Sequence, residues 1–391
     1  MTSTMKILTV DIGTGTQDIF LYDSNLDIEN GFKLVLPSPT MMIHHRVKQM
    51  IQTQTPLLFT GHQMGGGPSA WAIEEAARAG IPVYMTPSAA TTLNDELDKV
   101  EKLGIKIIGE DEVEALRSKV ESLELKDFDF ELISKTFNDY GVSLKDLGAI
   151  AVAVFDHGNS PAGISDRQFR FDYLDARIKE KNSLSAFAYL SNDIPKIMTR
   201  LQSVADSADG LPCPLVVMDT APAAILGANL DPIVAKRPRK LIVNVGNFHT
   251  LAFRLGDGIE GVFEHHTGEI DLPKLEKYIH ALADGSLKHQ DIFDDMGHGA
   301  LVYGNNPFEF GKDEFDIVVT GPRRSLFGRG GSRPAPTLLP YFATPFGDMM
   351  IAGCFGLLAA TAEILPNVTE PILRSLREAG GRGVAPWDNP S

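Results

Sequence analysis

Residues 6–23 read KILTVDIGTGTQDIFLYD, and this stretch decides the fold class. Its apolar run, Lys6–Gly13, predicts a short buried strand. The turn at residues 13–16 and a second strand at Asp18–Asp23 predict a hairpin. Gly31–Pro37 adds a third strand, so the chain is expected to open with a three-stranded meander.

The turn of this hairpin carries residue types that bind phosphate. Glycines allow the backbone to approach a ligand closely, and turn amides and threonine hydroxyls can bind phosphate oxygens. Asp11 ends the first strand, and a buried carboxylate is costly unless it faces a cation or donor groups. We expect Asp11 to organise a magnesium ion through water. A tight hairpin whose glycines only supply positive φ is the alternative. The candidate phosphate-binding residues are Gly13, Thr14, Gly15, Thr16 and Gln17.

The same pattern begins again in the second half of the chain. Lys240–Gly246, His249–Leu255 and Gly258–His265 predict a second meander. Its first turn, within NVGNFHT at residues 244–250, is again polar and contains glycine, which favours phosphate binding at both turns. The candidate residues in the second turn are Asn244, Gly246, Asn247 and Thr250.

Helices and strands alternate after each meander, and each half ends in a helix rich in small residues. Helices are expected at residues 40–54, 70–79, 184–205, 221–230, 272–283, 288–294 and 346–365, and the charged stretch 95–146 is expected to be mostly helical. Further strands are expected at residues 56–60, 148–155, 214–218 and 315–320. We therefore predict an α/β protein with lobes at residues 1–235 and 236–376, a ligand cleft between them and a loose tail at 377–391.

A run of three glycines is a second candidate anion site. Gly65, Gly66 and Gly67 follow a predicted strand and precede a predicted helix. Free amides and the helix dipole both favour an anion at a helix N-terminus. A flexible turn is the alternative.

Acidic residues and histidines at predicted strand ends are candidates for catalysis, because strand ends line the cleft of α/β folds. Asp156 or His157 could act as a general base toward a phosphoryl acceptor. Glu264 and His265 are candidate transition-metal ligands, although adjacent histidines in a strand point to opposite faces. Asp219 either caps the following helix or shares the magnesium ion of the first turn. For any single histidine, a hydrogen-bonded structural role is the alternative.

Three segments together resemble the actin-like ATPase superfamily of actin, sugar kinases and heat-shock chaperones. DIGTGTQDIFLYD (residues 11–23) is similar to its first phosphate motif, NVGNFHT to its second, and VVTGPRR (residues 318–324) to its adenosine motif. The resemblance implies two duplicated ribonuclease H-like lobes with an interlobe cleft, and ATP and magnesium as cofactors. It adds Gly321, Arg323 and Arg324 as candidate nucleotide-binding residues, since arginine can clamp a phosphate or carboxylate.

Two departures from the superfamily pattern bear on ATP turnover. The second phosphate motif usually begins with Asp, whereas Asn244 carries no charge. The adenosine motif usually has paired glycines, whereas here Pro322 follows Gly321. A phosphotransferase or ATPase with an unknown acceptor is therefore weighed against a noncatalytic nucleotide- or metabolite-binding sensor or scaffold. A metal-dependent enzyme that uses the Asp, His and Glu residues is a second alternative.

Five segments resemble a narrower archaeal and bacterial family that is assigned to the same superfamily. They are TGHQMGGGPSA, FDHG, FEHHTGE, VTGPRR and PFGDMMIAGCFGLL. Members of that family carry the label of pyruvate formate-lyase activating enzymes. A glycyl-radical activase needs three closely spaced cysteines for its iron–sulfur cluster. This chain has two distant cysteines, Cys213 and Cys354, so we expect no such cluster and no activase.

The composition excludes several other classes. A formal net charge of −15 opposes binding to nucleic acid or to an anionic membrane surface. No window approaches about 18 uninterrupted apolar residues, and the first residues contain too short an apolar run for a signal peptide. We expect a cytoplasmic protein whose partner is a small phosphorylated or nucleotide ligand.

Overall fold

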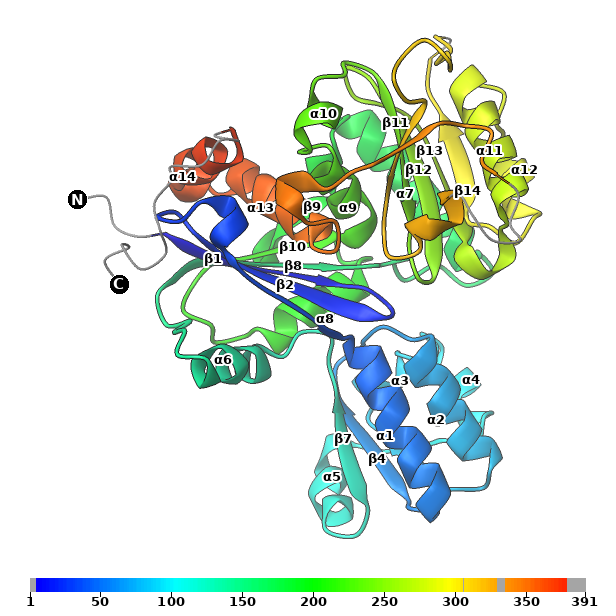
Figure 1. Ribbon diagram of the computed structural model, residues 1–391. Helices are drawn as coiled ribbons and strands as arrows, with labels where there is room; N and C mark the ends of the chain where they lie inside the picture. Colours follow the sequence, from blue (N-terminus) through cyan, green and yellow to red (C-terminus); the bar gives the residue numbers. More distant parts are fainter. Residues whose placement is uncertain (1–4, 305, 329–334, 378–391) are drawn as a thin grey trace.

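Three β-sheets organise the chain, and the first one contains the opening meander (Figure 1). The computed structural model describes residues 5–304, 306–328 and 335–377. The first sheet has the order β3-β2-β1-β8-β10-β9, in which β1 is antiparallel to β2 and parallel to β8. Its strands are β1 (Lys6–Ile12), β2 (Thr16–Asp23), β3 (Phe32–Pro37), β8 (Leu147–Val154), β9 (Ala188–Leu190) and β10 (Leu215–Asp219). The predicted meander is confirmed.

The second sheet repeats this arrangement around β11. Its order is β14-β13-β12-β11-β15-β16, with β11 antiparallel to β12 and parallel to β15. On one side of β1 and of β11 lies an antiparallel meander, and on the other side lie two parallel strands, to which the first sheet adds the antiparallel edge strand β9. The strands are β11 (Lys240–Val245), β12 (His249–Leu255), β13 (Ile259–His266), β14 (Gly299–Val302), β15 (Ile317–Thr320) and β16 (Pro340–Phe342).

Two helices of small residues pack against each other between these sheets. Helix α9 (Thr220–Ala228) follows β10, and α13 (Ala352–Ile364) lies near the C-terminal end of the described chain (Figure 1). A Cβ added to Gly356 would lie 2.8 Å from the carbonyl carbon of Ala223, so the two backbones approach too closely for a larger residue. The inner face of α9 packs on the second sheet through Ile225, and α13 packs on the first sheet through Phe355.

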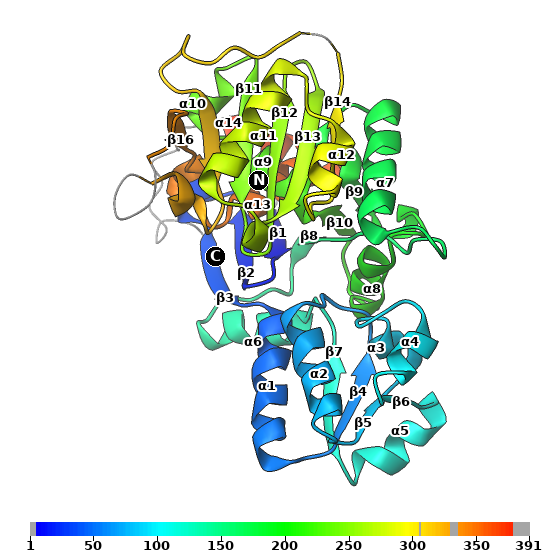
Figure 2. The ribbon, with the colours of Figure 1, turned by 90° about the vertical axis from the view of Figure 1, so that its right-hand side faces the viewer.

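A third sheet forms a separate layer, inserted between β3 and β8 and lying below the other two in Figure 2. Its order is β6-β5-β4-β7, and all its strand pairs are parallel. The strands are β4 (Leu57–Gly61), β5 (Val83–Met85), β6 (Lys106–Ile107) and β7 (Glu121–Leu125). Helices α1 (Pro39–Thr53), α2 (Pro68–Arg78), α3 (Pro87–Ala90), α4 (Leu97–Glu101) and α5 (Glu110–Arg117) accompany it.

Several sequence expectations were wrong in this part of the chain and around residues 184–205. The stretch 95–146 contains strands β6 and β7, because Leu123 and Leu125 alternate with exposed residues at period two and are buried in the core. The helix expected at 184–205 is broken by β9 and a turn at Pro195, and its α-helical part is α8 (Thr199–Ser207), preceded by two short 3-10 helices. The helix α7 (Asp166–Glu180) was missed because most of its residues are polar.

The last apolar helix begins later than expected. Phe346 and Gly347 have φ of 50° and 77°, so this turn interrupts the helix predicted from residue 346 and α13 begins at Ala352. The remaining helices are α6 (Phe130–Asp139), α10 (Pro232–Ala235), α11 (Leu272–Asp284), α12 (His289–Phe293) and α14 (Pro366–Arg377). The loose tail predicted for 377–391 lies, apart from Arg377, outside the described residues. The lobe boundary predicted at residue 235 stays a prediction.

None of the helices within the described ranges combines the length and the apolar character needed to cross a membrane.

Candidate functional site

One cavity of about 940 Å³ collects most of the residues singled out in the sequence. It is lined from the first sheet, the second sheet, the three-glycine loop and the start of α13. The predicted site residues in its lining are Asp11, Gly13, Thr14, Thr16, Gly65, Gly66, Gly67, Asp156, His157, Asn244, Gly246, Asn247 and Gly321. Those outside the lining are Gly15, Gln17, Asp219, Thr250, Glu264, His265, Arg323 and Arg324.

Asp11 projects from β1 toward this cavity. Its Oδ1 accepts a 2.5 Å hydrogen bond from Thr220 Oγ1, and the backbone of Gly353 lies against the carboxylate. Burial raises the pKa of Asp11 to about 6, and Asp219 adds to the rise while the Thr220 hydrogen bond opposes it. A cation bound beside this carboxylate would lower its pKa again, because an opposite charge favours the ionised form.

Asp18 is a second carboxylate at this place, and the sequence analysis missed it. It pairs directly with Asp11 across the β1–β2 ladder, so both side chains lie on one face of the sheet. Its Oδ1 is buried and has no hydrogen-bond partner among the described residues. Burial, with the nearby Asp11, raises the pKa of Asp18 to about 8. The signal was available, because a hairpin that turns at residues 13–16 places residues 11 and 18 opposite each other.

The two hairpin turns meet at the wall of the cavity. A Cβ on Gly15 would lie 3.2 Å from Asn247 Cγ, so the first turn contacts the second turn at this glycine. Gly13 and Thr14 line the cavity on one side of this contact, and Gly246 and Asn247 line it on the other.

Two of the predicted turn residues point elsewhere. Gln17 Nε2 donates to Pro37 O at the neighbouring strand β3. Thr250 is fully buried, and its hydroxyl lies 2.9 Å from that of Thr267. By contrast, Asn244 lines the cavity, and its Oδ1 is buried without a partner in the described part of the chain. An unpartnered buried amide oxygen is a place for a ligand donor or a cation.

The three-glycine loop is held by a buried ion pair. Asp127 accepts from the backbone N–H of Gly65, and Arg200 donates to both oxygens of Asp127 at 2.7 and 3.0 Å. Arg200 also donates to Phe155 O at 2.6 Å, which joins the loop to the end of β8. Gly67 has φ of 62°, the left-handed region that favours glycine, directly before α2 begins.

The segment that resembles an adenosine motif reaches the cavity only in part. Gly321, with φ of 96°, and Pro322 line it. Arg323 is exposed, and Arg324 lies over the ring of Phe342 at 5.6 Å, outside the lining. The structure therefore does not bring the two predicted clamp residues to the cavity.

Asp156 lies at the end of β8 and is nearly fully buried. Its Oδ1 accepts from Gly158 N at 2.8 Å and its Oδ2 from Leu201 N at 2.9 Å. Burial raises the pKa of Asp156 to about 6, against these two hydrogen bonds. Both oxygens therefore already have donors, while each keeps a free lone pair.

Asp219 is engaged by protein donors instead of facing Asp11 across an open site. Its Oδ1 caps α9 by accepting from Ala221 N at 2.9 Å. Its Oδ2 accepts from Arg170 Nη1 at 2.6 Å. The capping role that was one of the two alternatives is present, and Asp219 does not line the cavity.

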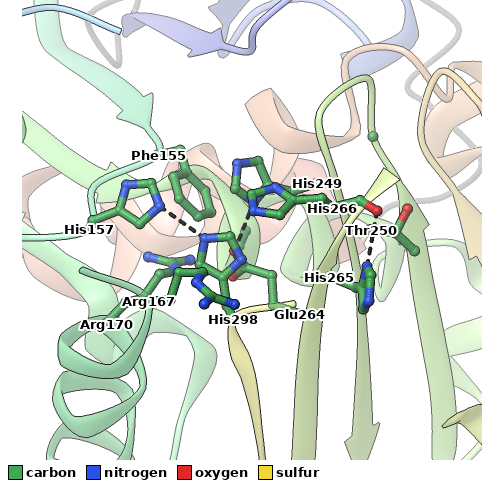
Figure 3. A network of polar contacts seen from close by, with 12 residues as sticks. Phe155, His157, Arg167, Arg170, His249, Thr250, Glu264, His265, His266 and His298 are labelled. Atoms are coloured by element: carbon green, nitrogen blue, oxygen red, sulfur yellow. Dashed lines mark hydrogen bonds and ion pairs between the residues drawn. The ribbon is translucent and has the colours of Figure 1, made fainter. Parts of the chain in front are cut away.

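Four histidines gather beside Phe155 at one side of the cavity (Figure 3). His157 Nε2 and His298 Nε2 are 3.0 Å apart, and the His249 ring stacks on Phe155 with a centroid distance of 4.0 Å. The His266 ring centroid lies 4.7 Å from that of His298. Burial lowers the pKa of His157 and of His298, and burial with His249 lowers that of His266 to about 4.

The buried Glu264 side chain lies next to two of these histidines, His249 and His298. Its Oε1 lies 2.9 Å from His249 Nδ1 and 3.5 Å from His298 Nδ1, and its Oε2 accepts from Arg170 Nε at 2.9 Å. Burial by itself would raise the pKa of Glu264. The Arg170 guanidinium outweighs this effect and holds that pKa well below its usual range. The sequence singled out Glu264 but paired it with His265.

His265 faces away from the cluster, as alternation along β13 requires. Its Nε2 lies 3.2 Å from Asp295 Oδ2, and its ring stacks on Tyr278 of α11. Figure 3 shows His265 on the other side of the strand from Glu264 and His249. The structure therefore does not bring Glu264 and His265 to one ion. The histidines that lie beside Glu264 are His249 and His298. No spacing in the sequence indicates that these two residues lie close together.

Comparisons with known proteins give one family and several distant structures. The family model described as "Putative pyruvate format-lyase activating enzyme (DUF1786)" matches residues 64–326. No curated protein matches the chain.

Three of the similar solved structures have low identity. An exopolyphosphatase-like protein is 11% identical with a TM-score of 0.25, and the match covers 81% of this chain and 66% of that one. A ROK hexokinase from Thermus thermophilus is 12% identical with a TM-score of 0.22, covering 65% and 48%. A nucleotide-free acetone carboxylase is 11% identical with a TM-score of 0.21, covering 65% and 44%. This chain thus spans less than two thirds of the length of each of these three proteins.

Proposed function

This chain belongs to the family whose model matches residues 64–326, and we propose that it binds the phosphate chain of a nucleotide, or a similar phosphorylated ligand, between its two hairpin turns. We further propose that it is an ATP-dependent phosphotransferase or ATPase with the actin-like architecture of two duplicated lobes. The cavity then corresponds to the interlobe cleft, and the acceptor is unknown.

One observation carries this proposal: two sheets share the arrangement of a three-stranded antiparallel meander followed by two parallel strands, and their equivalent turns meet at one cavity. The turn after β1 and the turn after β11 contact each other at Gly15 and Asn247. Backbone amides in such turns, together with the Thr14 and Thr16 hydroxyls, are donors that a phosphate chain needs. A pair of opposed donor turns suits a chain of several phosphates better than a single anion.

The residues present also suit a magnesium ion. Asp11 and Asp18 supply carboxylate oxygens at the cavity, and Asp18 Oδ1 and Asn244 Oδ1 are buried without a partner among the described residues. Hard cations prefer such oxygen ligands, and magnesium keeps several waters. Bound there, magnesium would neutralise phosphate charge during phosphoryl transfer. Asp11 and Asp18 would hold it, and their raised pKa values would fall when it binds.

A noncatalytic ligand-binding role is the second candidate, because two observations favour it. Asn244 stands where an acidic residue would otherwise help to place magnesium or a nucleophile. The two oxygens of Asp156, the candidate general base, already accept from backbone N–H groups.

We do not propose that this chain has the pyruvate formate-lyase activating activity after which its family is named. An iron–sulfur cluster of the activase type needs three closely spaced cysteines. Cys354 is buried in α13 with its thiol directed at Asp18 O, and Cys213 lies in the loop before β10. The two thiols lie on different elements and belong to no common site.

Thermal unfolding with and without Mg-ATP, Mg-ADP and inorganic phosphate tests the proposal. A ligand that binds the folded state at 100 times its Kd stabilises it by about 2.7 kcal/mol, and we expect a magnesium-dependent rise in Tm. Asp11→Asn should abolish this rise, while Asp139→Asn on the exposed end of α6 should preserve it. No rise with any of these ligands would refute the proposal. Phosphate release from Mg-ATP then separates the enzyme from the noncatalytic candidate.

A further inference from the structure

We propose that His157, His249 and His298 form a binding site for a divalent transition metal ion of the zinc type, with an open coordination position facing the cavity. The three residues come from the end of β8, the start of β12 and the loop before β14. They use none of the residues that hold phosphate in the proposed function. The two proposals therefore stand or fall separately.

The three imidazoles already lie close to the spacing that a metal needs. One ligand atom from each lies within 4.8 Å of the other two, and the Nε2 atoms of His157 and His298 are 3.0 Å apart. Zinc–nitrogen bonds of about 2.0–2.1 Å in tetrahedral geometry place the nitrogens roughly 3.4 Å apart. Small side-chain rotations are enough to reach that spacing.

A carboxylate is hydrogen-bonded to one of the three rings in the way that metal-binding histidines require, and it lies near a second ring. Glu264 Oε1 lies 2.9 Å from His249 Nδ1 and 3.5 Å from His298 Nδ1. A histidine ligand usually donates its other ring N–H to a carboxylate, which fixes the tautomer and leaves the second nitrogen for the metal. Glu264 therefore leaves His249 Nε2 free for a metal, and His298 Nε2 already faces His157 Nε2 at 3.0 Å.

The local charge also favours a cation at this place. Arg170 is the buried positive group beneath the cluster, and it pairs with both Asp219 and Glu264. Glu264 places a carboxylate directly beside two of the imidazoles, which suits a cation there, while Arg167 adds a positive charge near His266. Neutral imidazole is the form that binds metals.

The surroundings of the three histidines fit an open metal site, at which a bound ligand can exchange, better than a closed structural site. His157 and His249 line the cavity, whereas His298 is fully buried behind them. Three protein ligands with one open position are typical of catalytic zinc. Phe155 stacks on His249 and shields one side of the site from water. Imidazole ligands select zinc and similar ions over magnesium, which prefers oxygen.

Metal titration of the full chain, without nucleotide, tests this inference. After chelator treatment and dialysis, we expect the protein to bind about one zinc ion per chain and to give a visible Co²⁺ spectrum of low coordination number. His157→Ala and His249→Ala remove ligands at the cavity wall and should each weaken zinc binding by more than tenfold. Glu264→Gln should weaken it by about 10–100-fold, the range typical for carboxylates that orient ligands.

His45→Ala is the matched control, because His45 is exposed on α1 and far from the cluster in sequence. It should leave zinc affinity unchanged. Circular dichroism confirms that each variant is folded, and the cavity-wall variants avoid the fully buried His298. Substoichiometric zinc in the wild type, or unchanged affinity in the double variant His157→Ala/His249→Ala, would overturn the inference.

Discussion

Gly353 at the start of α13 offers a way to move the Asp11 carboxylate without removing it. A Cβ added to Gly353 would lie 2.6 Å from Asp11 Cγ and would overlap one carboxylate oxygen. Backbone atoms at both residues are fixed, Asp11 within β1 and Gly353 within the α9–α13 packing. In Gly353→Ala the Asp11 side chain must therefore rotate away from its present position.

The cost of this rotation follows from the contacts that are lost. The 2.5 Å hydrogen bond from Thr220 Oγ1 to Asp11 breaks, and a bond to a charged group contributes about 1.5–3 kcal/mol. A side chain displaced by about 30° from its rotamer costs about 0.5–1.5 kcal/mol more. Replacing a helical glycine by alanine returns about 0.5–1 kcal/mol. We expect Gly353→Ala to lower the free energy of unfolding by about 1–4 kcal/mol without ligand.

Thermal unfolding with the ligand that shifts the wild-type protein most is the assay. The wild type should gain about 2.7 kcal/mol at 100 times the Kd, whereas Gly353→Ala should lose the magnesium-dependent part of this gain. Gly268→Ala is the control, since an added Cβ there meets no atom within 4 Å. If Gly353→Ala keeps both the wild-type Tm and the full magnesium-dependent rise, Asp11 does not act as we reason.

Three further predictions test the packing around the cavity. A thiol reagent should label Cys213 but not Cys354 in the native protein at pH 7. Burial raises the pKa of both thiols, but only Cys354 is also enclosed and out of the reagent's reach. Mass spectrometry that finds Cys354 labelled without denaturant would contradict this. Gly356→Ala should lower the free energy of unfolding in urea by about 1–3 kcal/mol or more, since its added methyl overlaps the backbone of α9, and an unchanged midpoint would argue against that close approach. Arg200→Met should cost about 3–5 kcal/mol, because it removes the charge that pairs with the buried Asp127. Equal stability in chemical denaturation would show that the pair is dispensable.

Local sequence determined the two meanders and the turns between their strands. Short apolar runs separated by glycine turns leave few alternatives to a hairpin, and Asp11, Gly13 and Asn247 were placed correctly relative to their strands. Strands of the inserted sheet were harder to predict. β6 and β7 are short and carry charged residues on their exposed side, so their composition is that of a solvated helix. The period of the hydrophobic residues distinguishes a strand from a helix only in longer segments.

Tertiary structure decided which side chains share a site. The cavity brings together Asp11 with Asp18, and His157 with His249 and His298, although as many as 141 residues separate the paired nitrogens of His157 and His298. It also turned Arg323, Arg324 and His265 away from the place that their motifs suggested. A motif fixes the backbone conformation of its own few residues. Contacts between distant segments depend on how the sheets pack, which is set by the whole core and by close approaches such as that of α9 and α13.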